Sequence, residues 1–351
     1  MSLSPIFGTL VILLGGVFAA CYLLPLRAVK GWAYETSWLF YALAGLLVYP
    51  SVLGLLTVPD FFGVVFSASS GTLLKVFAYG VVWGVGALCW GLMVRYLGIG
   101  LGLAVGCGLC AATGTLLPPV VTGHAADLVK DAAACTVLGG VLVSIVGIVL
   151  TGLAGKSKEA ELDEATKKAG VKEFDFRKGM LLGVVSGVAS GAINFGLQGA
   201  PELESAALEA GAASAWAGMP VLAVVLAGGW LSNTVWAIGS GVVKRWRGGV
   251  VFRFSTIPVL HRSTFFNLLF AGAVGVIGVS QFACQKIGEP LLGDMRYISF
   301  AVLMAAAILV STAVGVFTGE WKGTGKKTRL LLAAGVVVLV AGFTVMSMAG
   351  R

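Results

Sequence analysis

The fold is decided by residues 155–178, GKSKEAELDEATKKAGVKEFDFRK, because this charged stretch separates two long apolar halves. It holds seven of the 24 Lys and Arg residues and six of the 16 Asp and Glu residues. The 351-residue chain is 58% hydrophobic and 11% charged, whereas soluble proteins are roughly 25% charged. This composition predicts an all-α, polytopic membrane protein.

The apolar runs on either side are long enough to cross a membrane. A helix needs about 20 apolar residues to cross a hydrocarbon core about 30 Å thick. Only Arg95, Tyr96 and Leu97 separate the third run from the fourth, so the sequence predicts a tight helical hairpin there. The ten expected transmembrane helices lie near residues 4–24, 37–57, 73–94, 98–118, 134–154, 179–198, 214–240, 263–285, 297–318 and 328–348.

These spans divide into two groups of five. Residues 1–154 form the expected first repeat, 155–178 a charged cytoplasmic linker, and 179–351 the second repeat. With an odd number of spans in each half, the second half enters the membrane from the opposite face. This 5+5 inverted repeat is the plan of many secondary transporters.

The positions of Lys and Arg predict the orientation. The odd-numbered connectors carry 19 of them and the even side carries 5, so the positive-inside bias places the odd connectors in the cytoplasm and both termini outside. This bias explains the net charge of +8 without nucleic acid, because the basic residues form no aromatic-interleaved patch.

No pattern for a cofactor, a metal or hydrolysis is present: HExxH, GxSxG and GxxxxGK[ST] are all missing. Cys107 and Cys110 form a CxxC pair inside an apolar run, where we expect packing and no redox or metal role. The sequence therefore predicts no enzyme. It leaves open whether the protein is a homodimer.

Two rows of glycine recur every fourth residue and so line one face of a helix each. They are Gly98, Gly102 and Gly106 in the fourth run, and Gly179, Gly183, Gly187 and Gly191 in the sixth. Small residues at this spacing let helices approach closely. Both rows are expected to face protein, whether for static packing or for sliding.

Several short stretches, taken in order, resemble the L-rhamnose/proton symporter family of the drug/metabolite transporter superfamily. The resemblance implies a ten-helix bundle that takes up a sugar with a proton across a bacterial inner membrane. The chain departs from the family near residues 292–296 and 201–213, which leaves the particular sugar open. The matching stretches are WAYET (32–36), GLMVRYLG (91–98), GTLLPP (114–119), EFDFRKG (173–179), YIS (297–299) and GEW (319–321).

Polar side chains at membrane depth are costly, so they point to a substrate pathway. Most of them here are amides, which both donate and accept and so suit sugar hydroxyls. Aromatic rings offer a flat apolar surface for a sugar. The expected substrate-binding residues are Asn194, Gln198, Asn233, Asn267, Gln281, Tyr22, Trp83 and Trp90. The alternative for each amide is an interhelical hydrogen bond worth about 1 kcal/mol.

Proton coupling needs a group that titrates, yet the middle third of every expected span lacks Asp, Glu and His. The expected proton-coupling residues therefore lie near span ends: Glu320, Glu35 and Asp294. Alternatively, Glu320 balances Lys322 and Glu35 balances Lys30. Trp32, Trp38, Trp216 and Trp321, also near span ends, fit an interfacial belt.

The hypothesis is a secondary transporter that imports L-rhamnose or a related deoxy sugar with H⁺ by alternating access in the inner membrane. Its expected partners are the sugar, the proton and the lipid bilayer. An exporter or exchanger of another small metabolite is the alternative within the same class. A membrane sugar receptor that does not transport is the alternative from another class.

Overall fold

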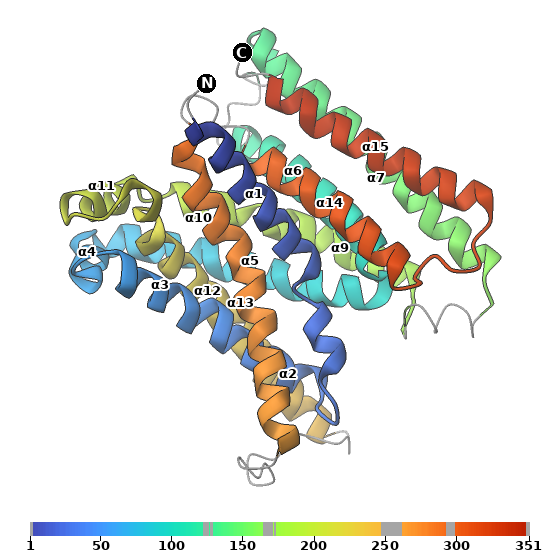
Figure 1. Cartoon of the computed structure of the whole chain (residues 1–351), viewed down its shortest axis with the longest axis horizontal. Coiled ribbons are helices and arrows are strands. Elements are labelled where there is room, and N and C mark those ends of the chain that lie inside the picture. Colours follow the sequence, from blue (N-terminus) through green and yellow to red (C-terminus); the bar gives the residue numbers. More distant parts are fainter. Residues whose placement is uncertain are drawn as a thin grey trace. The chain divides into compact units, whose positions relative to one another are not determined.

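The computed structural model describes residues 3–121, 126, 129–163, 171, 173–246, 262–292 and 299–348. Every regular element in these ranges is a helix (Figure 1). The all-α prediction is thus confirmed for the described part of the chain. The main helices are α1 (Leu3–Cys21), α2 (Tyr34–Tyr41), α3 (Tyr49–Thr57), α4 (Phe61–Ser67), α5 (Ser70–Leu97), α6 (Ile99–Val121), α7 (Ala132–Glu161), α9 (Phe176–Ser190), α10 (Ala192–Gln198), α11 (Pro201–Glu209), α12 (Met219–Trp246), α13 (Arg262–Leu291), α14 (Ser299–Phe317) and α15 (Lys326–Met348).

Eight helical segments in the described ranges are long and apolar enough to cross a membrane. Two shorter apolar helices, Ile99–Cys110 and Val302–Phe317, lie where the fourth and ninth spans were expected. The eight segments are Ile6–Ala28, Tyr34–Thr57, Ser70–Leu97, Ala132–Glu161, Phe176–Glu209, Ser214–Ser240, Thr264–Leu291 and Lys326–Met346.

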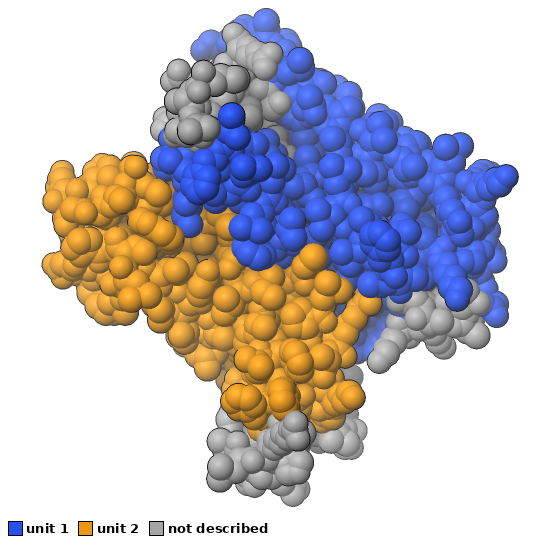
Figure 2. Space-filling view, in the orientation of Figure 1, with its two compact units in different colours: residues 1–20, 86–191, 287–351 blue, residues 21–85, 192–286 orange. Residues whose placement is uncertain are grey.

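The chain forms two compact units, which Figure 2 distinguishes by colour. Unit 1 contains residues 1–20, 86–191 and 287–351, and unit 2 contains residues 21–85 and 192–286. Each unit takes segments from both halves of the sequence. The units therefore do not coincide with the two expected repeats.

In unit 1, α7 and α15 lie side by side along their length (Figure 1). A Cβ added at Gly140 would lie 2.7 Å from the carbonyl oxygen of Gly342, whereas one at Gly147 would lie 3.0 Å from that of Gly335. Residue numbers that increase along α7 thus meet residue numbers that decrease along α15, so the two helices are antiparallel. Small residues allow this close approach.

The predicted hairpin is confirmed. Helix α5 ends at Leu97, Gly98 takes a φ of +88°, and α6 begins at Ile99. Only glycine adopts this left-handed conformation without strain. Both glycine rows are buried against protein as expected: a Cβ at Gly187 would overlap Leu109 of α6, and one at Gly106 would lie 2.7 Å from Met93 of α5.

Unit 2 is built around close helix crossings of the same kind. A Cβ at Gly80 would overlap the carbonyl oxygen of Val225 on α12. In the second span, α2 and α3 are joined by η2 (Ala42–Val48), a π-helical segment. Gly45 of η2 packs against Gly275 of α13 so closely that neither could carry a Cβ without overlap.

Two expectations about helix ends are wrong. Helix α7 continues past residue 154 to Glu161, and Gly155 and Lys158 are buried, so the first residues of the expected linker, 155–161, are helical and partly buried. Trp38 and Trp321 are also buried, so they do not belong to an interfacial belt. Both errors concern side chains that contact residues distant in the sequence.

Candidate functional site

In unit 2, three of the expected sugar-binding residues gather around one stretch of α13. The Gln281 amide donates to the carbonyl of Gly278 at 2.8 Å. The ring of Tyr22 covers Gly278, since a Cβ there would lie 2.9 Å from it. Trp83 of α5 packs edge-on against Phe282, with ring centroids 5.5 Å apart. The two rings thus contact α13 within four residues of each other, and Gln281 lies in the same turn.

Asn194 and Gln198 lie on α10, a short helix separated from α9 by an interruption at Gly191. Phe195 of α10 stacks on Tyr79 of α5 at 5.6 Å, one helical turn from Trp83. Asn194 is half-buried and Gln198 is exposed, and neither amide makes a hydrogen bond to the described residues. Such an amide is available to a ligand.

Asn233 has every polar group occupied. Its Oδ1 accepts from Trp38 Nε1 at 2.7 Å, and its Nδ2 donates to the carbonyls of Gly84 and Gly229 at 3.1 and 2.7 Å. The residue is fully buried. In this conformation its amide therefore joins α2, α5 and α12 and leaves no donor for a sugar.

Replacing Asn233 by Ala is expected to lower the free energy of unfolding by about 1 to 2 kcal/mol, because it leaves Trp38 Nε1 without a partner and removes the bond between α12 and the Gly84 carbonyl. Thermal unfolding of the purified protein measures this. In a double-mutant cycle with Trp38→Phe the two losses should not add. Additive losses would show that the hydrogen bond between Trp38 and Asn233 does not contribute to stability.

Asn267 lies 14 residues before Gln281 on α13, or about 21 Å along the helix axis. Its amide accepts from Lys30 N at 3.1 Å and donates to Lys30 O at 2.7 Å. This reciprocal pair satisfies both backbone groups of one connector residue. Asn267 thus fixes the connector between η1 (Leu24–Ala28) and α2, away from the Gln281 cluster.

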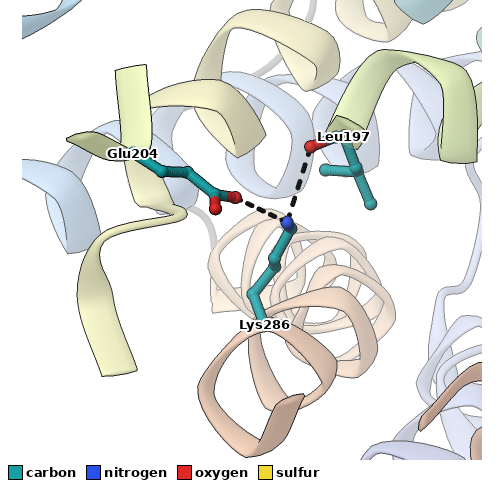
Figure 3. Close-up of polar contacts among 3 residues, drawn as sticks. All are labelled: Leu197, Glu204 and Lys286. Atoms are coloured by element: carbon teal, nitrogen blue, oxygen red, sulfur yellow. Dashed lines mark hydrogen bonds and ion pairs between the residues drawn. The ribbon is translucent and has the colours of Figure 1, made fainter. Parts of the chain in front are cut away.

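Lys286, one residue beyond the eighth expected span, contacts two other helices of unit 2 (Figure 3). Lys286 Nζ lies 2.7 Å from Glu204 Oε1 on α11 and 3.5 Å from the carbonyl oxygen of Leu197 on α10. Its side chain is only 11% exposed. Lys286 therefore ties α13 to the end of the helix that carries Asn194.

In unit 1, Glu320 is buried and its carboxylate meets the first turn of α6. It accepts from Ile99 N at 2.9 Å and from Gly100 N at 3.0 Å. Carboxylates are stabilised at a helix N-terminus by the orphan N–H groups and the helix dipole. A Cβ at Gly98 would lie 2.6 Å from Glu320 Oε2, so this turn has no room for a larger residue.

Lys158, which lies in the expected linker, contacts the ring of Trp321, the residue that follows Glu320 in the chain. The lysine is 1% exposed, and its Nζ lies 4.9 Å from the ring centroids of both Phe174 and Trp321. A sequence signal exists: with Gly147, Thr151 and Ala154, Lys158 continues the buried face of α7 at steps of three and four.

The segment before α9 is fixed to the α5–α6 hairpin. Arg95 Nη2 lies 2.6 Å from Glu173 Oε1, and Asp175 N donates to Tyr96 O at 3.2 Å. Asp175 also caps α9 by accepting from Lys178 N at 3.0 Å. Hydrogen bonds from the Lys178 side chain and backbone hold the pKa of Asp175 below its ordinary value.

The remaining expected residues belong to different units or lie outside the described residues. Trp90 belongs to unit 1, where its ring lies against Gly106. Glu35 is buried in the first turn of α2, in unit 2. Asp294 lies outside the described residues. Cys107 and Cys110 are both buried free thiols.

Eight long apolar helices with buried amides and charges define a multi-pass membrane protein. A family model described as L-rhamnose-proton symport protein (RhaT) matches residues 1–350. The chain belongs to this family, which is one of transporters and not of enzymes.

Three curated relatives are named L-rhamnose-proton symporter. That of Klebsiella pneumoniae is 32% identical over 332 residues, covering 93% of each chain. That of Cronobacter sakazakii is 31% identical over 352 residues, covering 99% of each. That of Escherichia coli is 30% identical over 332 residues, again 93% of each. The family resemblance found in the sequence is thereby confirmed, whereas the superfamily stays a prediction.

Proposed function

We propose that this protein imports L-rhamnose, or a closely related deoxy sugar, together with H⁺ across a bacterial inner membrane. The observation that carries this proposal is the family match over residues 1–350, supported by relatives of the same length that bear the symporter name. Uptake of labelled L-rhamnose into proteoliposomes tests it. Uptake that is indifferent to an imposed pH gradient would defeat the symport mechanism.

The proposed architecture is ten spans in a 5+5 inverted repeat, with both termini periplasmic and alternating access between the halves. The eight long and two shorter apolar helices fall at the ten expected positions. An inverted repeat requires its fifth and tenth spans to run in opposite directions. The antiparallel packing of α7 on α15 supports this requirement.

The proposed sugar site contains Gln281, Tyr22, Trp83 and Asn194 in unit 2. The interruption between α9 and α10 supports it, because discontinuous helices form the binding sites of many transporters. Asn194 offers an unengaged amide, and Gln281 is bonded only to the carbonyl of its own helix. Both can reorient toward hydroxyl groups without breaking a contact between helices.

Asn194→Ala and Gln281→Ala are each expected to lower L-rhamnose uptake at least about tenfold at low sugar concentration, because a lost hydrogen bond to a buried ligand costs about 1.4 kcal/mol or more. The amount of folded protein should stay near the wild-type level. Initial uptake rates and chromatographic monodispersity measure both quantities. Wild-type uptake by both variants would remove them from the site.

Two alternatives predict different results. An exporter or exchanger would show counterflow of another metabolite in preference to L-rhamnose. A receptor would bind L-rhamnose without any counterflow. Counterflow of labelled L-rhamnose into preloaded proteoliposomes separates both from the symporter.

A further inference from the structure

The feature that carries a further inference is the buried ammonium group of Lys158. It has no hydrogen-bond acceptor among the described residues. Burial of a cation is costly unless an opposite charge compensates it. The rings of Phe174 and Trp321, each 4.9 Å away, offset part of this cost through their negative faces. The carboxylate of Glu320, the residue next to Trp321, adds an electrostatic attraction.

Among the described residues of these helices, the other charged groups are engaged elsewhere or are not buried. Arg95 pairs with Glu173 and Asp175 pairs with Lys178. Glu161 accepts from Gly325 N and from Thr328 Oγ1 at the start of α15. Helices α6 and α14 carry no charged residue, whereas Lys156, Lys322, Lys326, Lys327 and Arg329 are exposed. Lys158 and Glu320 are thus the two buried charged residues in the described part of unit 1.

We propose that Lys158 is a positioning residue for proton coupling: when its buried ammonium group is charged, the uptake of a proton by Glu320 disfavours the packed arrangement of this cluster. This inference rests on the proposed proton symport and takes Glu320, one of the three expected proton-coupling residues, as the group that carries the proton. Lys158 touches neither the sugar nor the proton. It acts through the carboxylate beside it.

The physical step is the conversion of a carboxylate to a carboxylic acid. The ionised group accepts two N–H donors, from Ile99 and Gly100. When a proton binds one carboxylate oxygen of Glu320, the resulting O–H group faces a backbone N–H group of α6, and both are donors. Lys158 also loses the negative charge that offsets its own. Both changes favour separation of the turn at residues 319–321 from α6. Proton uptake is thereby linked to movement of these elements.

The test compares the pH profile of L-rhamnose uptake between Lys158→Met, Lys158→Arg and wild type in proteoliposomes from pH 5 to pH 9. Because Lys158→Met removes a buried positive charge from this cluster, the half-maximal pH of L-rhamnose uptake should rise by about one unit or more. Lys158→Arg should retain the wild-type profile. Lys156→Met, at an exposed lysine of the same helix, is the matched control and should also retain it.

The outcomes separate this inference from the proposed function. A wild-type profile for Lys158→Met, together with loss of gradient dependence in Glu320→Gln, overturns the role of Lys158 and leaves the symport mechanism standing. Wild-type gradient dependence in Glu320→Gln overturns the proton assignment itself. If Lys158→Met fails to fold, the double variant Lys158→Met/Glu320→Gln should recover folded protein, because no charge is then buried alone. Absence of recovery overturns the counter-charge role.

Discussion

Replacing Glu320 by Gln is expected to abolish the accumulation of L-rhamnose driven by a pH gradient while leaving counterflow measurable. Gln is nearly isosteric but cannot take up a proton. It also keeps one acceptor for the N–H groups of Ile99 and Gly100. Accumulation should fall at least about tenfold, which corresponds to loss of about 1.4 kcal/mol of driving force. Proteoliposomes with and without an imposed gradient provide the measurement.

The matched control is Glu161→Gln. Like Glu320, Glu161 caps the start of another helix, since it accepts from Gly325 N at 2.7 Å and from Thr328 Oγ1 at 2.6 Å. It differs in being exposed. Glu161→Gln should therefore lower stability slightly and leave accumulation driven by the pH gradient unchanged. If both variants lose gradient-driven accumulation equally, capping explains the effect and Glu320 is not the proton site.

The second large effect is expected at Gly80, where α5 crosses α12. A Cβ at this position would overlap the carbonyl oxygen of Val225, and the backbone of Gly228 lies just beyond it. Because the obstacle is backbone, the helices must separate. Gly80→Ala should therefore lower stability by about 3 kcal/mol. Thermal denaturation monitored by size-exclusion chromatography in detergent measures the loss.

Gly239→Ala is the control for Gly80→Ala on α12, since a Cβ there meets nothing within 4 Å. Alanine is the better helix former, so this variant should match or exceed wild-type stability. An equal loss in both variants would show that glycine at these positions serves backbone conformation and not the close crossing.

Much of the fold follows from local patterns. Apolar length located the helices, and the hairpin at Gly98 followed from two apolar runs with three residues between them. The glycine rows faced protein as expected, because a four-residue period defines a helix face whatever packs on it. The sequence did not predict that α7 continues to Glu161 and buries Lys158 against Phe174 and Trp321. The charge of these residues does not reveal such contacts.

The candidate sites were less predictable. The sequence identified the amides, but it could not distinguish Asn233 and Asn267, which are bonded to protein, from Asn194, which has no such bond in the described part. That difference depends on which backbone groups lie opposite each amide. Likewise, Glu320 was selected for its place near a span end. Its contacts with α6 and Lys158 come from segments more than 150 residues earlier.

The pairing of α7 with α15 has a mechanical consequence. Glycine and serine bring the two backbones together along several turns, and Ser157, Glu161 and Thr328 fasten one end with hydrogen bonds. Lipid tails have no room to enter such a seam. We therefore expect α7 and α15 to move together as one rigid body during transport.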